Sequence, residues 1–302
     1  MKAFKSMIEF SQYFNTEEKC REILEEQRWG DTPACPHCGS TNACRFKTDN
    51  KTFKCREKEC RKKFTVTVGT VYENTKVPLT KWFLATYILA NHSKGISSTQ
   101  LAEWLNVTQK TAWFLNHRIR EMLTDNAPEL LNKIVEVDET YVGGKLKKEK
   151  KLKGAKPMDN KTMVFGAIQR EGKLKTKVIA ENNADNIQRA VYEYVEVDSN
   201  LFTDESHAYK KMGADYNHET VNHRAKEYAR GIVHTNTIEG YWNLLKKQID
   251  GIHHFVSPKH LQRYCNESTY RYNTRSMNQS ERFVEALKQC SGRLTYNNLI
   301  NG

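Results

Sequence analysis

Two closely spaced pairs of cysteines constrain the fold of this chain more than any other feature. Cys35 and Cys38 form the first pair, in the run Cys-Pro-His-Cys-Gly, and sixteen residues separate Cys38 from the second pair, Cys55 and Cys60. Tetrahedral zinc takes four soft ligands, which two such pairs supply without a large hydrophobic core. The pattern predicts a small zinc ribbon with one structural Zn²⁺ on these four cysteines, because four thiolates leave no coordination position open for catalysis.

The sequence leaves alternatives to this ligand set. His37 or Cys44 could replace one of the four cysteines, or the thiols could be buried without a metal. Disulfides are not expected, because the cysteines are clustered and residues 1–10 show no secretory signal. The remaining cysteines are expected to be ordinary core residues: Cys20, Cys265 and Cys290.

The charge of the chain favours a polyanionic partner. The net charge is +12 and the pI is near 9.2, and the segment from Arg45 to Lys63 holds nine basic residues against three acidic ones. Nucleic acid is the first candidate, because each neutralised phosphate releases counterions. A merely soluble basic surface is the alternative. Three phenylalanines within the basic segment are expected to form the small core of the ribbon: Phe46, Phe53 and Phe64.

No membrane-spanning segment is expected. The longest apolar stretch, residues 82–90, is about half the length that a bilayer requires. We therefore expect a cytoplasmic protein that is associated with DNA.

Three predicted helices follow the ribbon. Residues 79–91 are apolar around most of a helix, and Ser97 begins a second helix with Gln100 at capping spacing. After a short turn, Thr108 caps a third helix that runs to about Leu123. This order resembles a helix-turn-helix, whose second helix enters the major groove of DNA.

The helix-turn-helix interpretation assigns roles to residues of the third helix. The residues of its first turn would read bases, namely Gln109, Lys110 and Thr111. Arg118 and Arg120, further along, are candidates for phosphate contacts. A plain helical hairpin that packs on the ribbon is the alternative.

The remaining part of the chain predicts an α/β domain. A strand ends near Asp138, two more strands cover residues 163–180, and residues 184–195 have helical periodicity. A strand that ends at Asp204 follows, then another helix, a short strand, and a helix over residues 236–249 that carries Glu239. This is the order of an RNase H-like fold, in which the first and fourth strands are neighbours.

In that fold three carboxylates would converge. Asp138 and Asp204 would lie side by side, and Glu239 would approach from the helix, beside a core stripe of Ile238, Trp242, Leu245 and Ile249. Converging carboxylates repel unless cations neutralise them. Two Mg²⁺ or Mn²⁺ ions would suit the site, since such ions take carboxylate oxygens and keep positions for water and phosphate.

Each carboxylate also has a purely structural interpretation. Asp138 could be an exposed acid at a strand end, Asp204 could cap the next helix, and Glu239 has capping-box spacing from Asn236. Three other acids compete for the same roles: Glu136, Glu139 and Glu205. In a regular strand, Glu139 and Glu205 would point to the opposite face of the sheet. The thirty-four residues between Asp204 and Glu239, on a strand and a later helix, favour the catalytic interpretation.

Several motifs resemble one family. The chain is similar to insertion-sequence transposases that join a zinc ribbon to a DDE catalytic domain (ISXO-like enzymes, bacterial relatives of the Merlin superfamily). The resemblance rests on Cys-Pro-His-Cys-Gly-Ser (35–40), Lys-Phe-Thr-Val-Thr-Val-Gly-Thr (63–70), Val-Asp-Glu-Thr-Tyr-Val-Gly-Gly-Lys (137–145), Thr-Asp-Glu-Ser (203–206), His-Thr-Asn-Thr-Ile-Glu-Gly-Tyr-Trp (234–242) and Arg-Tyr-Asn-Thr-Arg (271–275).

The resemblance implies an RNase H-like catalytic core, Mg²⁺ dependence and action on the inverted-repeat ends of a mobile element. Matched motif by motif, the three acids are Asp138, Asp204 and Glu239, and Lys246 matches a lysine that relatives use two helical turns after the third acid. Lys246 is expected to contact a phosphate. Some relatives carry asparagine or histidine at the third position, whereas this chain has glutamate.

We accordingly expect a multidomain protein that binds double-stranded DNA, at least as a dimer. The expected segments are an N-terminal helical segment (1–32), the zinc ribbon (33–77), the helix-turn-helix (78–128), the catalytic domain (129–275, with a basic loop at 143–161) and a helical tail (276–302). The alternatives are a zinc-ribbon and helix-turn-helix transcription regulator with an inert C-terminal domain, and a stand-alone nuclease.

Overall fold

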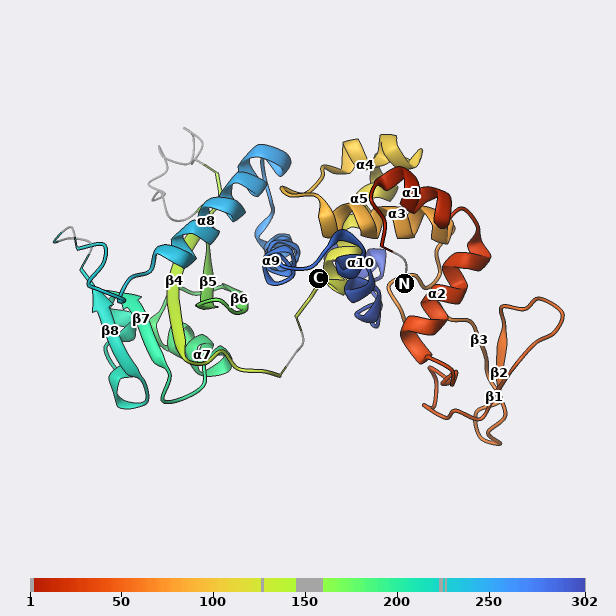
Figure 1. The fold of residues 1–302 in the computed structure, drawn as a ribbon, viewed down its shortest axis with the longest axis horizontal. Coiled ribbons are helices and arrows are strands. Elements are labelled where there is room, and N and C mark those ends of the chain that lie inside the picture. The colour runs from red at the N-terminus through yellow and green to blue at the C-terminus, as the bar shows by residue number, and fades with distance from the viewer. Residues whose placement is uncertain (1–2, 126–127, 145–159, 223–224, 226, 302) are drawn as a thin grey trace. The chain divides into compact units, whose positions relative to one another are not determined.

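The computed structural model describes residues 3–125, 128–144, 160–222, 225 and 227–301 (Figure 1). The chain forms two compact units, residues 1–124 together with 274–302, and residues 125–273. Most of the predicted basic loop at 143–161 lies outside the described residues. Among the described residues, no helix is both long enough and apolar enough to cross a membrane.

The first unit combines short strands with helices from both ends of the chain. Its elements are α1 (Met7–Tyr13), α2 (Glu17–Trp29), β1 (Ala43–Arg45), β2 (Phe53–Cys55), β3 (Lys63–Phe64), α3 (Leu79–Asn91), α4 (Ser98–Leu105), α5 (Gln109–Met122), α10 (Gln279–Lys288) and α11 (Tyr296–Asn301). The strands form an antiparallel sheet in the order β1-β2-β3.

A cluster of aromatic side chains holds this unit together. Phe283 of α10 packs edge-on against Phe10 of α1 and Phe83 of α3, with ring centroids 4.9 and 5.4 Å apart. Because α10 supplies part of this core, the C-terminal segment completes the N-terminal unit. Residues 276–302 are predicted from the sequence to be a separate helical tail, whereas the structure places α10 and α11 in the first unit.

The predicted caps of the helices after the ribbon are confirmed. Ser97 Oγ accepts a hydrogen bond from the backbone N–H of Gln100 at the start of α4 (3.1 Å), and Thr108 Oγ1 accepts one from Thr111 at the start of α5 (3.2 Å). Asn106, in the left-handed conformation at φ 48°, ends α4 and turns the chain into α5.

The second unit is a mixed sheet with helices on both faces. Its elements are β4 (Ile134–Val142), β5 (Thr162–Gln169), β6 (Leu174–Ile179), α7 (Ala184–Tyr194), β7 (Asn200–Asp204), η2 (His207–Tyr209), η3 (Met212–Ala214), β8 (Asn217–Val221), α8 (Asn236–Gln248), η5 (Ile249–His253) and α9 (Pro258–Asn273). The strand order is β6-β5-β4-β7-β8. The predicted neighbourhood of the first and fourth strands is confirmed, because β4 pairs with β7 in parallel.

The helix predicted between the fourth and fifth strands is wrong. The described chain there has the 3₁₀ turns η2 and η3 instead of an α-helix. Gly213 lowers the helix propensity of this segment. Tyr209 of η2 and Met212 of η3 are both buried.

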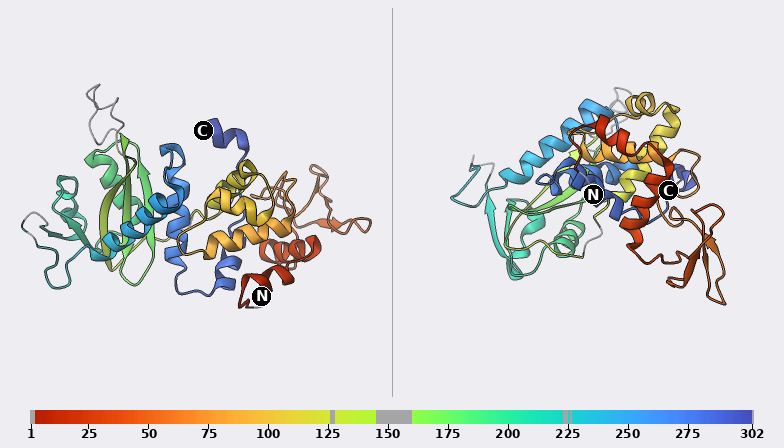
Figure 2. Two further views of the ribbon diagram at one scale, coloured as in Figure 1. Left: turned by 90° about the horizontal axis from the view of Figure 1, so that it is seen from above. Right: turned by 45° about the vertical axis from the view of Figure 1, so that its right-hand side comes forward.

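Side chains alternate between two cores along the strands. On one face Val135, Val137 and Phe165 pack with α7. On the other face Val164 and Ile168 pack with α8 and α9. The ribbon views show these helices beside the sheet (Figures 1 and 2). The predicted inner stripe of α8 is confirmed, since all four of its members are buried: Ile238, Trp242, Leu245 and Ile249.

Candidate functional site

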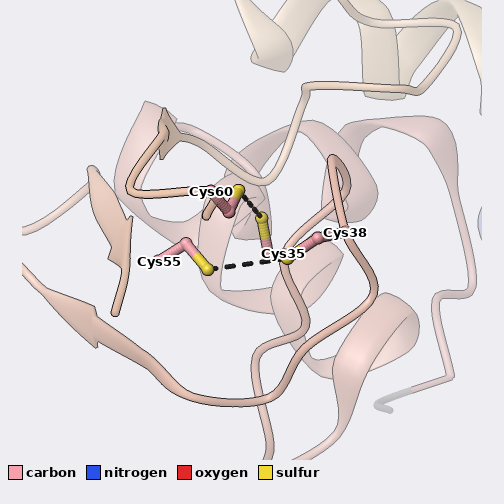
Figure 3. Close-up of side chains that lie close together, drawn as sticks. All are labelled: Cys35, Cys38, Cys55 and Cys60. Atoms are coloured by element: carbon pink, nitrogen blue, oxygen red, sulfur yellow. Dashed lines mark hydrogen bonds between the residues drawn. The ribbon is translucent and has the colours of Figure 1, made fainter. Parts of the chain in front are cut away.

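The four cysteines of the ribbon come together as a metal site would require (Figure 3). The Sγ atoms of Cys35 and Cys60 are 3.8 Å apart and those of Cys38 and Cys55 are 3.6 Å apart, and all four lie within 4.8 Å of one another. Tetrahedral zinc with Zn–S bonds of about 2.3 Å places its sulfurs about 3.8 Å apart. The thiols therefore fit one Zn²⁺. Neither His37 nor Cys44 belongs to this group.

Aromatic rings form the core behind these cysteines. Phe53 and Phe64 stack with centroids 5.4 Å apart, and Trp29 at the end of α2 packs edge-on against both rings. The prediction for Phe46 is wrong, because it is half-exposed and lies outside the cluster, with Lys63 Nζ 5.0 Å from its ring. The ribbon and α2 are thus one packed structure.

Metal analysis of the purified protein is expected to find one zinc ion per chain. Cys38→Ser should lose this zinc and lower the stability of the first unit, because metal binding contributes directly to the folding of small zinc domains. Cys44→Ser is the matched control and should retain the zinc. Retention of a full zinc load by a Cys38→Ser, Cys55→Ser double variant would contradict the ligand set.

The structure places the predicted base readers at the start of α5. Gln109 and Lys110 are exposed, and Thr111 is half-buried. Gln109 Nε2 donates to Ser98 Oγ at 2.7 Å, and Lys110 Nζ lies 5.0 Å from the ring centroid of Tyr296 in α11. A cation and an amide at an exposed helix start remain available to a ligand.

The phosphate-contacting roles predicted for Arg118 and Arg120 are wrong. Both side chains are buried, at 3% and 1% exposure. Arg118 Nη2 donates to the backbone oxygen of Glu73 at 2.8 Å, and its guanidinium lies over the ring of Trp82. Burial lowers the pKa of Arg118 to about 10. Residues 115–120 of α5 are enclosed on all sides, so these arginines support the fold.

The catalytic aspartates predicted from the sequence lie on neighbouring strands. The last paired positions of β4 and β7 are Glu136 and Phe202, and two residues beyond them the strands reach Asp138 and Asp204. Glu239 lies in the first turn of α8, on the face of the sheet that Trp242 contacts. All three carboxylates are half-buried.

Electrostatics link these acids. Burial raises the pKa of Asp138 to about 6, with further increases from the charges of Asp204 and Glu239, while hydrogen bonds from the backbone of Glu139 and from Trp242 lower it. Mutual repulsion of this kind is what a cation would relieve. Among the described residues, the four cysteines are the one group of possible metal ligands whose atoms all lie within 4.8 Å, so the three acids do not form such a group.

The donor chemistry of the three acids fits divalent cations. Hard ions such as Mg²⁺ prefer carboxylate oxygens, and a pair of ions about 3.5–4 Å apart takes ligands over a wider area than one ion does. Asp138, Asp204 and Glu239 would hold such ions.

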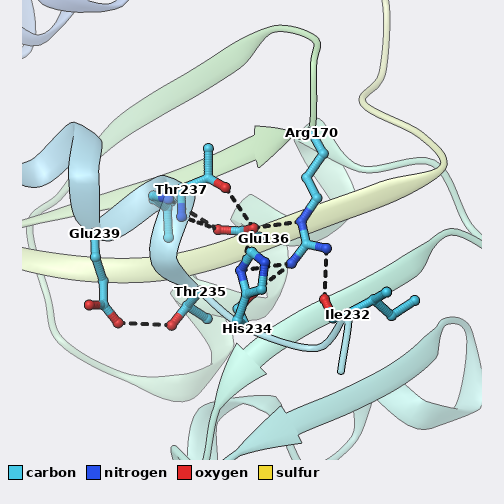
Figure 4. Close-up of polar contacts among 8 residues, drawn as sticks. Glu136, Arg170, Ile232, His234, Thr235, Thr237 and Glu239 are labelled. Atoms are coloured by element: carbon cyan, nitrogen blue, oxygen red, sulfur yellow. Dashed lines mark hydrogen bonds and ion pairs between the residues drawn. The ribbon is translucent and has the colours of Figure 1, made fainter. Parts of the chain in front are cut away.

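The structural interpretations of Asp204 and Glu239 are not supported. Asp204 Oδ1 accepts from the backbone of Ser206 (2.9 Å), but Ser206 itself caps the following turn. Helix α8 begins after Thr235, so Glu239 is one residue too far along for a capping box. Glu239 Oε1 instead accepts a hydrogen bond from Thr235 Oγ1 at 2.9 Å (Figure 4).

The true cap of α8 is Glu136, whose role the sequence reasoning missed. This fully buried carboxylate accepts from the backbone N–H groups of Thr237 (2.8 Å) and Ile238 (3.1 Å), and Arg170 Nε donates to it at 2.7 Å. His234 Nδ1 is 3.2 Å away (Figure 4). Glu136 and Asp138 are two residues apart on β4 and therefore lie on the same face of the sheet. That alternation is the one sequence feature that points to the role of Glu136.

Glu139 occupies the opposite face, as predicted from strand alternation. Its carboxylate accepts a hydrogen bond from the hydroxyl of Tyr209, which belongs to the core beneath α7. Burial raises the pKa of Glu139 to about 8, with contributions from Asp138 and Asp204. Lys246, by contrast, is exposed on α8, seven residues after Glu239.

Comparisons with known proteins find two transposase domains and a protein of a transposable element. Residues 130–273 match the ISXO2-like transposase domain, and residues 15–63 match the transposase zinc-ribbon domain. A protein in transposable element ISH50 of Halobacterium salinarum is 27% identical over 266 residues, which are 83% of this chain and 89% of that protein. The crystal structure of a pre-cleavage Mos1 transpososome matches 94% of this chain and 98% of its own at 13% identity, and its TM-score of 0.26 does not establish a shared fold.

A transposase zinc ribbon followed by a transposase domain on a mixed α/β sheet defines the class of protein. By these matches the chain carries a transposase zinc-ribbon domain and an ISXO2-like transposase domain.

Proposed function

We propose that this transposase binds the inverted-repeat ends of its element and catalyses Mg²⁺-dependent strand cleavage and strand transfer. The observation that carries the proposal is the placement of Asp138 and Asp204 on adjacent parallel strands, with Glu239 at the start of the helix that covers the same face. The strand order β6-β5-β4-β7-β8, with two antiparallel pairs and two parallel ones, supports an RNase H-like fold.

The proposed chemistry consists of two in-line displacements at phosphorus. In the first, the oxygen of a water molecule bonds to the phosphorus at the element end and the 3′ oxygen leaves as a hydroxyl. In the second, that 3′-hydroxyl attacks a phosphorus of the target DNA and displaces its 3′ oxygen. Bound Mg²⁺ supplies charge stabilisation for the attacking and leaving oxygens.

Residues of the chain prepare this reaction. Asp138, Asp204 and Glu239 present the carboxylate oxygens, and the anchored start of α8 fixes the third of them against the sheet. Transposition processes both ends of one element, so we propose that the protein acts on double-stranded DNA as a dimer or a larger assembly.

A cleavage assay tests the proposed function. Purified protein should cut a labelled duplex that carries an inverted repeat flanking the encoding gene, leave a 3′-hydroxyl, and join it to target DNA when Mg²⁺ is present. EDTA should abolish both products. Sequence-selective binding without any product under these conditions would favour the regulator, and cutting without preference for the ends would favour a general nuclease.

DNA reading by the start of α5 is a separate proposal. Because Gln109 and Lys110 are exposed on the first turn, we expect Gln109→Ala and Lys110→Ala to reduce discrimination between element ends and random DNA by about 1–3 kcal/mol if each reads a base. Competition binding at two salt concentrations measures this. Arg118→Ala is a contrasting control that should lower stability rather than selectivity. Wild-type selectivity in both Gln109→Ala and Lys110→Ala would contradict the assignment.

Lys246 is expected to act on phosphate. It is exposed two helical turns after Glu239, so Lys246→Ala should lower the cleavage rate and increase sensitivity to salt without changing the Mg²⁺ concentration required. A Mg²⁺ titration of cleavage at two ionic strengths measures both effects. Lys247, its exposed neighbour on α8, provides a control of the same charge, and an equal loss in Lys247→Ala would argue against a specific role.

A further inference from the structure

A tryptophan of α8 reaches the first of the proposed catalytic acids. Trp242 Nε1 donates a hydrogen bond to Asp138 Oδ2 at 2.9 Å, across 104 positions of sequence. The indole ring is buried, at 4% exposure. This bond joins the helix that carries Glu239 directly to the strand that carries Asp138.

The sheet has a place for this ring because of one glycine. Gly166 of β5 lies directly opposite Asp138 in the strand register. A Cβ atom at Gly166 would lie 2.6 Å from Cη2 and 2.8 Å from Cζ2 of Trp242, well inside contact distance. The indole can therefore occupy this position, with its N–H bonded to the carboxylate, only while residue 166 has no side chain.

We propose that Trp242 is a positioning residue that fixes the orientation of the Asp138 carboxylate for cation binding, and that Gly166 makes room for it. The inference rests on the proposed function, because it concerns the same site. A carboxylate has about four acceptor positions. The hydrogen bond from Trp242 occupies one of them and prevents rotation of the group, while acceptor positions remain for a cation.

Packing alone is the competing explanation, and Trp242→Phe separates the two. Phenylalanine keeps an aromatic ring against the sheet but removes the N–H donor. Tyr241→Phe is the matched control, since it removes the neighbouring hydroxyl, which lies 3.4 Å from Thr269 Oγ1 and does not contact Asp138.

The indole N–H itself provides a direct readout. The sequence has five tryptophans, so a ¹⁵N-tryptophan spectrum should show five indole signals, and Trp242→Phe identifies the signal of Trp242. Added Mg²⁺ should shift that signal, whereas the other four serve as controls for folding. Asp138→Asn should move the same signal in the absence of metal and abolish its response to Mg²⁺.

Metal dependence is the second readout. Trp242→Phe should raise the Mg²⁺ concentration for half-maximal cleavage about tenfold, as expected for loss of a hydrogen bond to a charged group, and Tyr241→Phe should not. Two results would overturn the positioning role: unchanged Mg²⁺ dependence in Trp242→Phe, or a Trp242 signal that responds neither to Mg²⁺ nor to Asp138→Asn. Cleavage by the wild type would still support the proposed function in either case. Absence of cleavage by the wild type would remove the proposed function and this inference with it.

A double-mutant cycle tests the role of Gly166. Gly166→Ala should lower stability in the wild-type background and raise the Mg²⁺ requirement, because the new methyl group displaces the outer indole ring. The same change should cost less beside Trp242→Phe, since phenylalanine lacks the outer ring atoms that would collide. Additive losses in the two backgrounds would show that Gly166 and Trp242 are not coupled.

Discussion

Asp138→Asn, Asp204→Asn and Glu239→Gln are each expected to abolish cleavage and strand transfer while binding to the element ends is unchanged. Each substitution keeps the size of the side chain and removes a charge that would hold Mg²⁺ against phosphate. Ions in such sites contribute several kcal/mol to the transition state, and 1.36 kcal/mol corresponds to a tenfold change in rate. We therefore expect rates to fall about a thousandfold or more in single-turnover cleavage of a labelled element end.

The same variants should remain folded, which separates chemistry from structure. In the absence of metal, burial holds the pKa of Asp138 near 6, above its ordinary value of 3.8. An acid with a raised pKa in the folded state favours folding when protonated, and this advantage is lost as the pH rises from about 4 through 6. At pH 8, Asp138→Asn removes a half-buried charge, so its thermal unfolding midpoint should equal or exceed that of the wild type.

Glu239→Gln is the most informative of the three. Glutamine can accept the hydrogen bond from Thr235 as glutamate does, so a structural role would leave the variant active. A fully active Glu239→Gln enzyme would contradict the assignment of three carboxylates. Loss of activity with intact folding and intact DNA binding would support it.

The features that the sequence predicts well depend on local patterns. The cysteine spacing identifies the ligand group of the ribbon, and the alternation of strands and helices places Asp138 beside Asp204, since the first and fourth strands pair in parallel. The caps at Ser97 and Thr108 are also local, because a side chain bonds to the backbone three residues away.

The features that the sequence does not predict depend on contacts between distant segments. Arg118 looks like a surface cation on a helix, but Glu73 and Trp82 enclose it from elsewhere in the first unit. Glu136 looks like one more acid in a strand, yet it caps a helix that begins a hundred residues later. In both cases charge suggests exposure, and burial with specific partners reverses that interpretation.

Glu136→Ala is expected to cause a large loss of stability in the second unit. The carboxylate accepts two backbone N–H groups of α8 and one from Arg170, and the Thr237 hydroxyl also donates to it at 2.8 Å. Breaking a buried ion pair by removal of one partner costs about 3–5 kcal/mol. For a unit of this size such a loss corresponds to a fall of roughly 10 °C in the unfolding midpoint.

Cleavage should also fall in Glu136→Ala, for a reason unlike that for the three acids. Without Glu136 the first turn of α8 loses its attachment to β4, and Glu239 lies in that turn. Glu136→Gln should lose less stability, because its carbonyl oxygen can still accept from the helix. Glu129→Ala is the control: its ion pair with Lys173 is exposed, and such surface pairs contribute about 0–1 kcal/mol. If calorimetry gave Glu136→Ala the wild-type midpoint, anchoring of α8 by Glu136 would be wrong. A lowered midpoint together with lost cleavage would distinguish this positioning residue from Asp138, whose replacement is expected to remove activity alone.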